Sequence, residues 1–260
     1  VLPIPEHLSK ARWTGRSRGT PGGYRIFIFM IRAFGVRGAY ALLWFVVPYY
    51  VLSARDSNRA IQAYFDRVRS IAPHTKGLSP FRSYLALGRS IIDSTAIRHG
   101  LSDRFRMSHE GQGNITAMAD GGKGGLLISA HLGNWDLAGP LLGNLRDRIS
   151  VVMLDAEHAR IKEALHGRAM GPAYDIIPLK EDLSHLFRIN GALAEGRLLC
   201  FHGDRSLPGA RVLKGTFLGK TAEFPAGPFA VAAAHGVPVA ISFVLRTGPL
   251  AYRLQANAMV

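Results

Sequence analysis

The chain has 260 residues, 48% of them hydrophobic, and a formal net charge of +14. This length and composition are enough to bury one sizeable core or two small ones. The single cysteine, Cys200, excludes an internal disulfide and a multi-cysteine zinc site, which fits a reducing compartment.

The positive charge is concentrated in the first part of the chain. Residues 1–110 contain 17 Lys or Arg against 6 Asp or Glu, whereas residues 111–260 contain 15 against 12. This asymmetry points to an anionic partner for the first part: nucleic acid, an anionic membrane surface or an acidic carrier protein.

Residues 24–52 are strongly apolar but are interrupted by Arg32, Gly35, Arg37 and Gly38. The uncharged part, 38–52, would span roughly 22 Å as a helix, which is shorter than the ~30 Å hydrocarbon core of a bilayer. No signal-peptide cleavage pattern accompanies it. Its Trp and Tyr residues favour the lipid–water boundary. We therefore predict a helical hairpin that dips into one leaflet, with a buried pair of core helices as the alternative. The basic residues flank these apolar helices and no groove-reading motif appears, so we expect no nucleic-acid partner.

Two further helices are predicted before residue 100. Within 57–72 the apolar side chains recur at spacings of four, three and three, which is one helical face. Ser79 and Pro80 have the pattern of a helix cap followed by a first-turn proline, and the helix they open would end near Gly100. We expect the first hundred residues to be helical, basic and lipid-facing.

After Gly121, short apolar runs alternate with helix-like segments. The runs cover 125–130, 149–154, 174–178, 197–201 and 237–244, and the helix-like segments cover 134–145, 156–170, 182–195 and 226–236. This alternation predicts an α/β fold with a mainly parallel sheet and flanking helices.

We accordingly predict two domains. Residues 1–110 would form a basic, largely helical, membrane-associating region that contains the apolar hairpin 24–52. Residues 111–260 would form the α/β catalytic domain. Because the chain lacks an initial Met and stops in a strand-like run, we expect it to be part of a longer protein that continues past residue 260.

His131 and Asp136 are the first candidates for chemistry. His131 follows a buried strand pattern, and reactive groups gather at the carboxyl ends of parallel strands. Asp136, in the first turn of the next helix, would hold the imidazole in one tautomer and stabilise its protonated form. No G-x-S-x-G elbow is present and Cys200 falls inside a buried strand pattern, so the nucleophile would belong to the substrate. The alternative is a capped helix with a structural histidine.

The residues around this pair resemble a known family. HLGNWD at 131–136 is similar to the His-x4-Asp/Glu box of the lysophospholipid acyltransferase superfamily, and SAHLGNWDLAG most resembles its lipid A biosynthesis (late acyltransferase) branch. FHGDR at 201–205 resembles the second box, and FLGKTAEFPAGPFAVAAAHGVPV at 217–239 resembles the third and fourth. The four boxes occur in the family's order, and the resemblance covers roughly residues 12–246.

The resemblance implies an O-acyltransferase that moves a fatty acyl chain from an acyl thioester to a hydroxyl of a membrane lipid. The thioester would be carried by acyl carrier protein or CoA as a co-substrate, with no resident cofactor. His131 would be the general base, oriented by Asp136. Arg205 would stabilise the oxyanion or hold a phosphate; the alternative is a surface arginine paired with Asp204.

The resemblance also implies three further substrate-binding positions. Asn134 would shape the pocket and cap the following helix. Glu223 matches a polar acceptor-binding position, or is an ordinary loop glutamate. Gly227 would allow close backbone approach at a helix amino terminus suited to an anionic group. The histidines outside the first box show no metal-ligand spacing, so we expect no metal.

The implied location is the inner (cytoplasmic) membrane, with peripheral or monotopic attachment to an anionic surface and the site facing the cytoplasm. One departure bears on the site: Pro140 cannot donate to the carbonyl of Asp136, so the helix that carries Asp136 should be kinked. Two rival functions stay open: a hydrolase that uses the same pair on water, and a non-catalytic lipid-binding relative.

Overall fold

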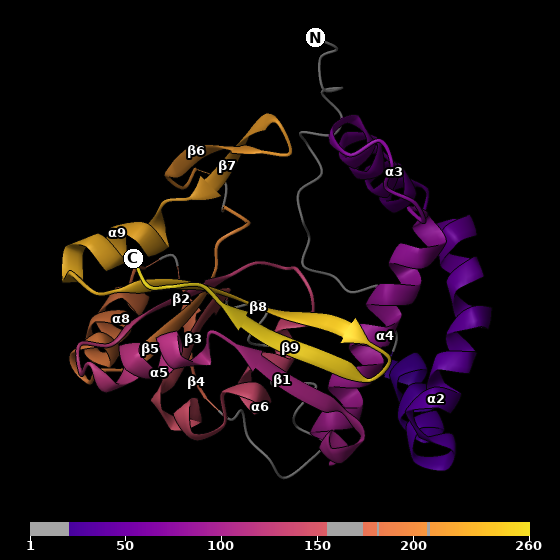
Figure 1. Ribbon diagram of the computed structural model, residues 1–260, viewed down its shortest axis with the longest axis horizontal. Coiled ribbons are helices and arrows are strands. Elements are labelled where there is room, and N and C mark those ends of the chain that lie inside the picture. The colour runs from indigo at the N-terminus through magenta and orange to yellow at the C-terminus, as the bar shows by residue number, and fades with distance from the viewer. Residues whose placement is uncertain (1–20, 155–173, 181, 207–208) are drawn as a thin grey trace.

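The computed structural model describes residues 21–154, 174–180, 182–206 and 209–260 (Figure 1). The helix predicted at 156–170 lies outside these residues.

The described chain is an α/β structure preceded by a helical layer. Its α-helices are α2 (Pro21–Ser53), α3 (Arg55–Ile71), α4 (Pro80–Arg98), α5 (Gln112–Asp120), α6 (Ala138–Leu142), α8 (His185–Ala194) and α9 (Gly227–His235). Its strands are β1 (Arg106–Glu110), β2 (Gly125–Ser129), β3 (Ile149–Leu154), β4 (Asp175–Leu179), β5 (Leu198–His202), β6 (Val212–Phe217), β7 (Lys220–Pro225), β8 (Val239–Gly248) and β9 (Ala251–Ala256).

Seven strands form one sheet in the order β1-β9-β8-β2-β5-β3-β4. All neighbouring pairs are parallel except β8 and β9, which form an antiparallel hairpin. The predicted α/β class with a mainly parallel sheet is therefore confirmed. In Figure 1 the antiparallel hairpin β6–β7 stands off this sheet, close to α9.

Both faces of the central strand β2 are buried, as expected for a parallel strand covered by helices. Leu126 and Ile128 pack in a cluster with residues of α8 and α9, whereas Leu127 packs in a second cluster with α4, α5 and α6. The helical layer and the sheet share this second cluster, so residues before 110 contribute directly to the core of the α/β unit. The strand β1, at 106–110, also belongs to the sheet.

The apolar segment 24–52 forms one helix with a break, not the hairpin that we predicted. Gly35 has a φ of 70° and a ψ of −178°, which interrupts α2 and which glycine adopts without a steric cost. Tyr50 near the end of α2 stacks with Tyr84 near the start of α4, while Ile28 lies with His99 just past its end. The two halves of α2 therefore follow each other along α4, since a hairpin would fold one half back onto the other.

Burial separates two faces of α2. Its buried side chains share the core with α4: Ile31, Val36, Ala39, Leu43 and Val47. Its other face exposes three arginines, Arg25, Arg32 and Arg37, and these large hydrophobic side chains: Ile26, Phe29, Phe34, Trp44, Phe45, Tyr49 and Leu52. The stretch Arg25–Ser53 is long and apolar enough to cross a membrane. The predicted alternative of a fully buried core helix pair does not describe it.

The cap predicted at Ser79 is confirmed. The Ser79 hydroxyl accepts a hydrogen bond from the backbone N–H of Arg82, and Pro80 is the first residue of α4. The helix ends at Arg98. Near this end, the Thr95 hydroxyl donates a hydrogen bond to the Ile91 carbonyl. This placement matters because the carboxyl-terminal half of α4 lies against the loop that carries His131.

Candidate active site

His131 and Asp204 meet at the carboxyl edge of the sheet. His131 follows β2 and Asp204 follows β5, and these strands are parallel neighbours in which Ser129 lies opposite His202. The backbone N–H of Gly203 donates to the Ser129 carbonyl at 2.8 Å, which extends the pairing past the strand ends. Adjacent parallel strands therefore deliver both side chains to the same place.

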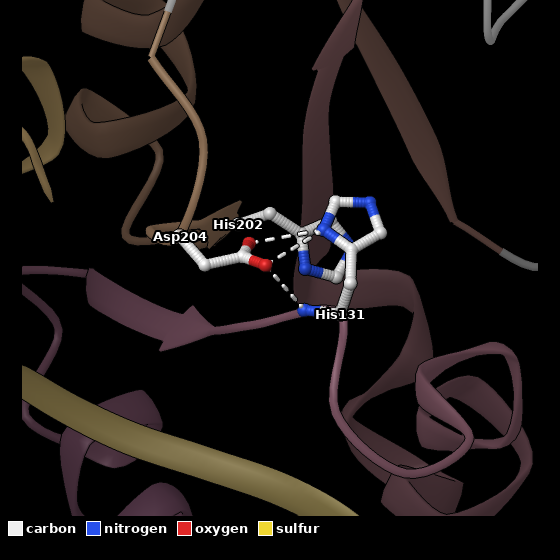
Figure 2. A group of neighbouring side chains, drawn as sticks. All are labelled: His131, His202 and Asp204. Atoms are coloured by element: carbon white, nitrogen blue, oxygen red, sulfur yellow. Dashed lines mark hydrogen bonds and ion pairs between the residues drawn. The ribbon is translucent and has the colours of Figure 1, made fainter. Parts of the chain in front are cut away.

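The Asp204 carboxylate holds His131 at two points (Figure 2). The backbone N–H of His131 donates to Asp204 Oδ2 at 3.1 Å, and its ring Nδ1 lies 2.9 Å from Asp204 Oδ1. The side chains are 24% and 29% exposed, respectively. A carboxylate at Nδ1 fixes the tautomer with a proton on that nitrogen, which leaves Nε2 as the basic atom.

The electrostatics of Asp204 fit this arrangement. Burial on its own would raise the pKa of Asp204, but the hydrogen bonds from the ring and backbone of His131 lower it below the ordinary aspartate value. Asp204 is therefore an ionised carboxylate at neutral pH, as a group that orients and stabilises an imidazolium must be.

His202 stacks against His131. The ring centroids of His131 and His202 are 4.3 Å apart, and the planes are inclined by 29°. The ring of Trp135 contacts His202 in a T-shaped arrangement, with 5.0 Å between the two centroids. Burial, followed by the nearby His131, lowers the pKa of His202 to about 4, so His202 is neutral at physiological pH. Within the described residues, its buried Nδ1 has no hydrogen-bond partner.

These three side chains also have the ligand types of a metal site. One ligand atom from each of His131, His202 and Asp204 lies within 4.8 Å of the others. The histidine spacing in the sequence concealed this set, because its members come from two strands. The expected absence of a metal therefore stays a prediction. The Nδ1 of His131 is already bonded to Asp204, which favours the hydrogen-bonded pair as the working arrangement.

Asp136 has a different partner from the one we predicted. Its carboxylate pairs with the guanidinium of Arg98, the last residue of α4. It lies in the 3-10 turn η2 (Trp135–Leu137), which precedes the five-residue helix α6. The helix predicted over 134–145 is thus broken into short pieces, as the proline at position 140 led us to expect. The structure assigns the hydrogen bond on His131 Nδ1 to Asp204, while the catalytic role predicted for Asp136 remains a prediction.

Asn134 is buried and is held by α4. Its Oδ1 accepts from the Ser94 hydroxyl at 2.8 Å, and its Nδ2 donates to the Ser90 carbonyl at 3.1 Å. Its side chain does not cap the following turn, so the predicted cap is wrong. The reason is that both polar ends of the amide are already bonded to α4.

The other predicted site residues lie on neighbouring segments. Arg205 directly follows Asp204 and is exposed. Glu223 is exposed on β7, opposite Lys214 of β6. Gly227 is the first residue of α9, and a Cβ built on it meets no atom of the described residues within 4 Å, so none of their close approaches requires glycine there. Substrate binding by these residues remains a prediction.

An apolar cavity of about 70 Å³ adjoins the pair. Its lining includes Trp135 and His202, which stacks on His131, together with Leu142, Tyr174 and Phe243. Cys200 also lines it, and burial raises the pKa of its thiol to about 12. Such a thiol is not a nucleophile at neutral pH.

Comparison with known proteins places most of the chain. Residues 91–260 match the family model described as bacterial lipid A biosynthesis acyltransferase. A search of curated protein sequences finds no match. The matched region contains the site loops, the nine strands of the described residues, and Ser94 and Arg98 of α4, which bond to Asn134 and Asp136.

Proposed function

This chain belongs to the bacterial lipid A biosynthesis acyltransferase family, and from that premise we propose that it transfers a fatty acyl group from a thioester to a hydroxyl of a membrane lipid. The hydrogen bond between His131 Nδ1 and Asp204 is the observation that carries this proposal, because it makes Nε2 a base at the exposed edge of the sheet. The thioester would be carried by acyl carrier protein or CoA, and no resident cofactor is proposed.

In the proposed reaction, His131 Nε2 removes the proton from the acceptor hydroxyl while the hydroxyl oxygen attacks the thioester carbonyl carbon. Asp204 stabilises the imidazolium that forms. The tetrahedral intermediate then expels the thiolate, which takes the proton from His131, so that an ester and a free thiol result. Base catalysis of this kind contributes typically ~10²–10⁴-fold to the rate. The raised pKa of Cys200 supports a direct transfer without an acyl-enzyme.

Two basic residues have proposed supporting roles. Arg205 adjoins Asp204 in the chain, which suits it to stabilise the oxyanion or to hold a phosphate of the donor or acceptor. Arg98 binds Asp136 and so ties the carboxyl end of α4 to the turn after His131. We therefore give the orienting role to Asp204 and propose that Asp136 supports the loop through Arg98.

The apolar surfaces suggest where the two substrates approach. The cavity behind Trp135 and His202 is suited to the first carbons of the acyl chain, because its lining is almost wholly apolar. The exposed aromatic and aliphatic face of α2 suits the acyl region of one leaflet, and the arginines on the helix suit anionic headgroups. We propose attachment to the inner membrane with the site on the cytoplasmic side.

Lipid mass spectrometry tests the proposal in cells. Lipids would be extracted from cells that express the intact chain, the His131→Ala variant, or neither. A lipid that gains one acyl mass only with the intact histidine supports transfer and identifies the acceptor. Identical lipid profiles in the three cultures, with both proteins present in the membrane, would reject it.

A further inference from the structure

A buried polar network lies behind the loop that carries His131, and the proposed reaction does not use it. Its centre is Asp93 of α4, whose side chain is fully buried. Asp93 Oδ2 accepts a hydrogen bond from the Tyr252 hydroxyl of β9, and its Oδ1 accepts one from the Tyr40 hydroxyl of α2. One carboxylate thus joins the helical layer to the sheet.

The network continues to the site loop through Asn134. The Nδ2 of Asn134 lies 3.5 Å from the Tyr252 hydroxyl, and the amide is also bonded to Ser90 and Ser94, which flank Asp93 on α4. The backbone of the same loop is fixed to β8, since the Asn134 N–H donates to the Val244 carbonyl at 2.8 Å. Asn134 is three residues from His131, so these contacts fix the position of the loop that carries His131.

The cost of burying these groups makes the arrangement specific. A buried carboxylate is tolerated where its oxygens are hydrogen-bonded, and Asp93 receives a tyrosine hydroxyl on each oxygen. Burial raises the pKa of Asp93, although the two tyrosine hydroxyls and the guanidinium of Arg246 oppose the rise. Arg246 also donates to the Tyr40 hydroxyl at 3.1 Å, which adds β8 to the network.

The backbone of the His131 loop is also held in place by close packing at Gly133. Gly133 has a φ of 75°, and a Cβ built on it would lie 2.1 Å from the Val244 carbonyl oxygen. Because this contact excludes any side chain, the backbone of the loop is pressed directly against β8. The position of His131 thus depends on β8 and on Asn134, and Asn134 depends on the network around Asp93.

From these contacts we infer that Asp93, acting through Tyr252 and Asn134, is a positioning residue that holds the His131 loop against α4 and β9. Tyr40 brings the apolar helix α2 into the same arrangement. The inference deepens the proposed acyl transfer and rests on it. The network does not touch substrate. Its loss would leave the His131 side chain and its chemistry unchanged, but the imidazole ring would sample a wider range of positions.

The test uses Tyr252→Phe and Asp93→Asn in the full chain, with Tyr84→Phe as the matched control. Tyr84 also lies between α4 and α2, against Tyr50, but in the described chain its buried hydroxyl has no hydrogen-bond partner. Thermal unfolding first establishes that each variant is folded. Two readouts follow: kcat and KM for acyl transfer, and the hydrogen-exchange rate of the backbone amides at 131–136.

We expect Tyr252→Phe and Asp93→Asn to lower kcat by about tenfold to a hundredfold, because a displacement of about 1 Å at the reacting group can cost that much. KM should change less than about twofold, because no group that binds substrate is removed. Amide exchange at 131–136 should become faster in both variants, and Tyr84→Phe should change neither readout. If Asp93→Asn does not fold, Tyr252→Phe carries the test.

Three results would overturn the inference: wild-type kcat in folded Tyr252→Phe, a lower kcat with unchanged amide exchange at 131–136, or an equal effect of Tyr84→Phe. If the wild-type chain transfers no acyl group, the proposed function has failed, and the exchange rates alone then decide whether the network holds the loop. Faster exchange in the two network variants supports this, and unchanged exchange rejects it.

Discussion

The carboxyl edge of the sheet and the helix α2 differ in the kind of side chain that they expose. At the sheet edge, the loops after β2 and β5 expose the polar Arg205 and the apolar Leu132, and the apolar residues of β2 beneath them are buried on both faces. On α2, one face is buried against α4 while the opposite face exposes Phe29, Phe45 and Leu52. This contrast supports the proposed attachment to a membrane through the exposed face of α2.

The largest expected effect is at His131, the proposed catalytic base. His131→Ala should lower acyl transfer by ~10²–10⁴-fold, because it removes the base and leaves the loop backbone in place. Folding and membrane binding should survive, since the ring is at the edge of the sheet. Turnover of a labelled acyl thioester, together with liposome flotation, measures both. Turnover near the wild-type rate would exclude His131 as the base.

The next largest effect should be a difference in kcat between variants of Asp204 and Asp136. Asp204→Asn should lower kcat by about 10²-fold, because an amide at His131 Nδ1 disturbs the tautomer that leaves Nε2 basic. Asp136→Asn should also lower the rate more than it weakens substrate binding, but by roughly tenfold less than Asp204→Asn. Steady-state kinetics of both variants decide this. The reverse order would return the orienting role to Asp136.

The exposed face of α2 supplies the next prediction. Phe45→Ser should weaken binding to anionic liposomes by roughly tenfold, since an apolar side chain that enters the bilayer contributes about 1.5–3 kcal/mol at most. Phe187→Ser is the matched control: Phe187 of α8 is 81% exposed and Phe45 is 79% exposed. Flotation measures both variants. Equal loss in the two would mean that α2 is not the membrane-facing surface.

A further expected effect is of a different kind and concerns the pH dependence of stability. Folded His202 titrates near pH 4 and an unfolded histidine near 6.5, so between these values the unfolded chain binds a proton that the folded chain does not. The free energy of unfolding should therefore fall as the pH decreases from about 6.5 to 4, by on the order of 3 kcal/mol from this residue. Urea unfolding of wild type and His202→Gln at pH 7 and 5 measures the difference. A parallel fall in both proteins would contradict it.

Much of the fold was predictable from local pattern. The apolar runs at 125–130 and 149–154 are the strands β2 and β3, and Ser79-Pro80 opens α4 as predicted. The strand β1, with its polar sequence RMSHE, was missed because it is mostly exposed and has no apolar run, so that only its pairing with β9 defines it as a strand. The hairpin β6–β7 was missed because its mixed sequence lacks a clear apolar run.

The partner of His131 was harder to predict than His131 itself. Asp136 is five residues away in the chain and Asp204 is 73 residues away, so local spacing favoured Asp136. The information that decides between them is the order of strands, which places β5 beside β2. His202 was concealed for the same reason. A rule that compares residues just after every predicted parallel strand would have found all three side chains.

The most direct test of the central claim is an acyl-transfer assay with purified protein. The wild-type chain and His131→Ala would be incubated with a thioester that carries a labelled acyl group, with and without liposomes of extracted bacterial lipid. The account predicts label in a lipid ester that requires both the liposomes and His131, with little label released as free fatty acid. Release of labelled fatty acid at the same rate with and without liposomes would contradict it and identify a hydrolase.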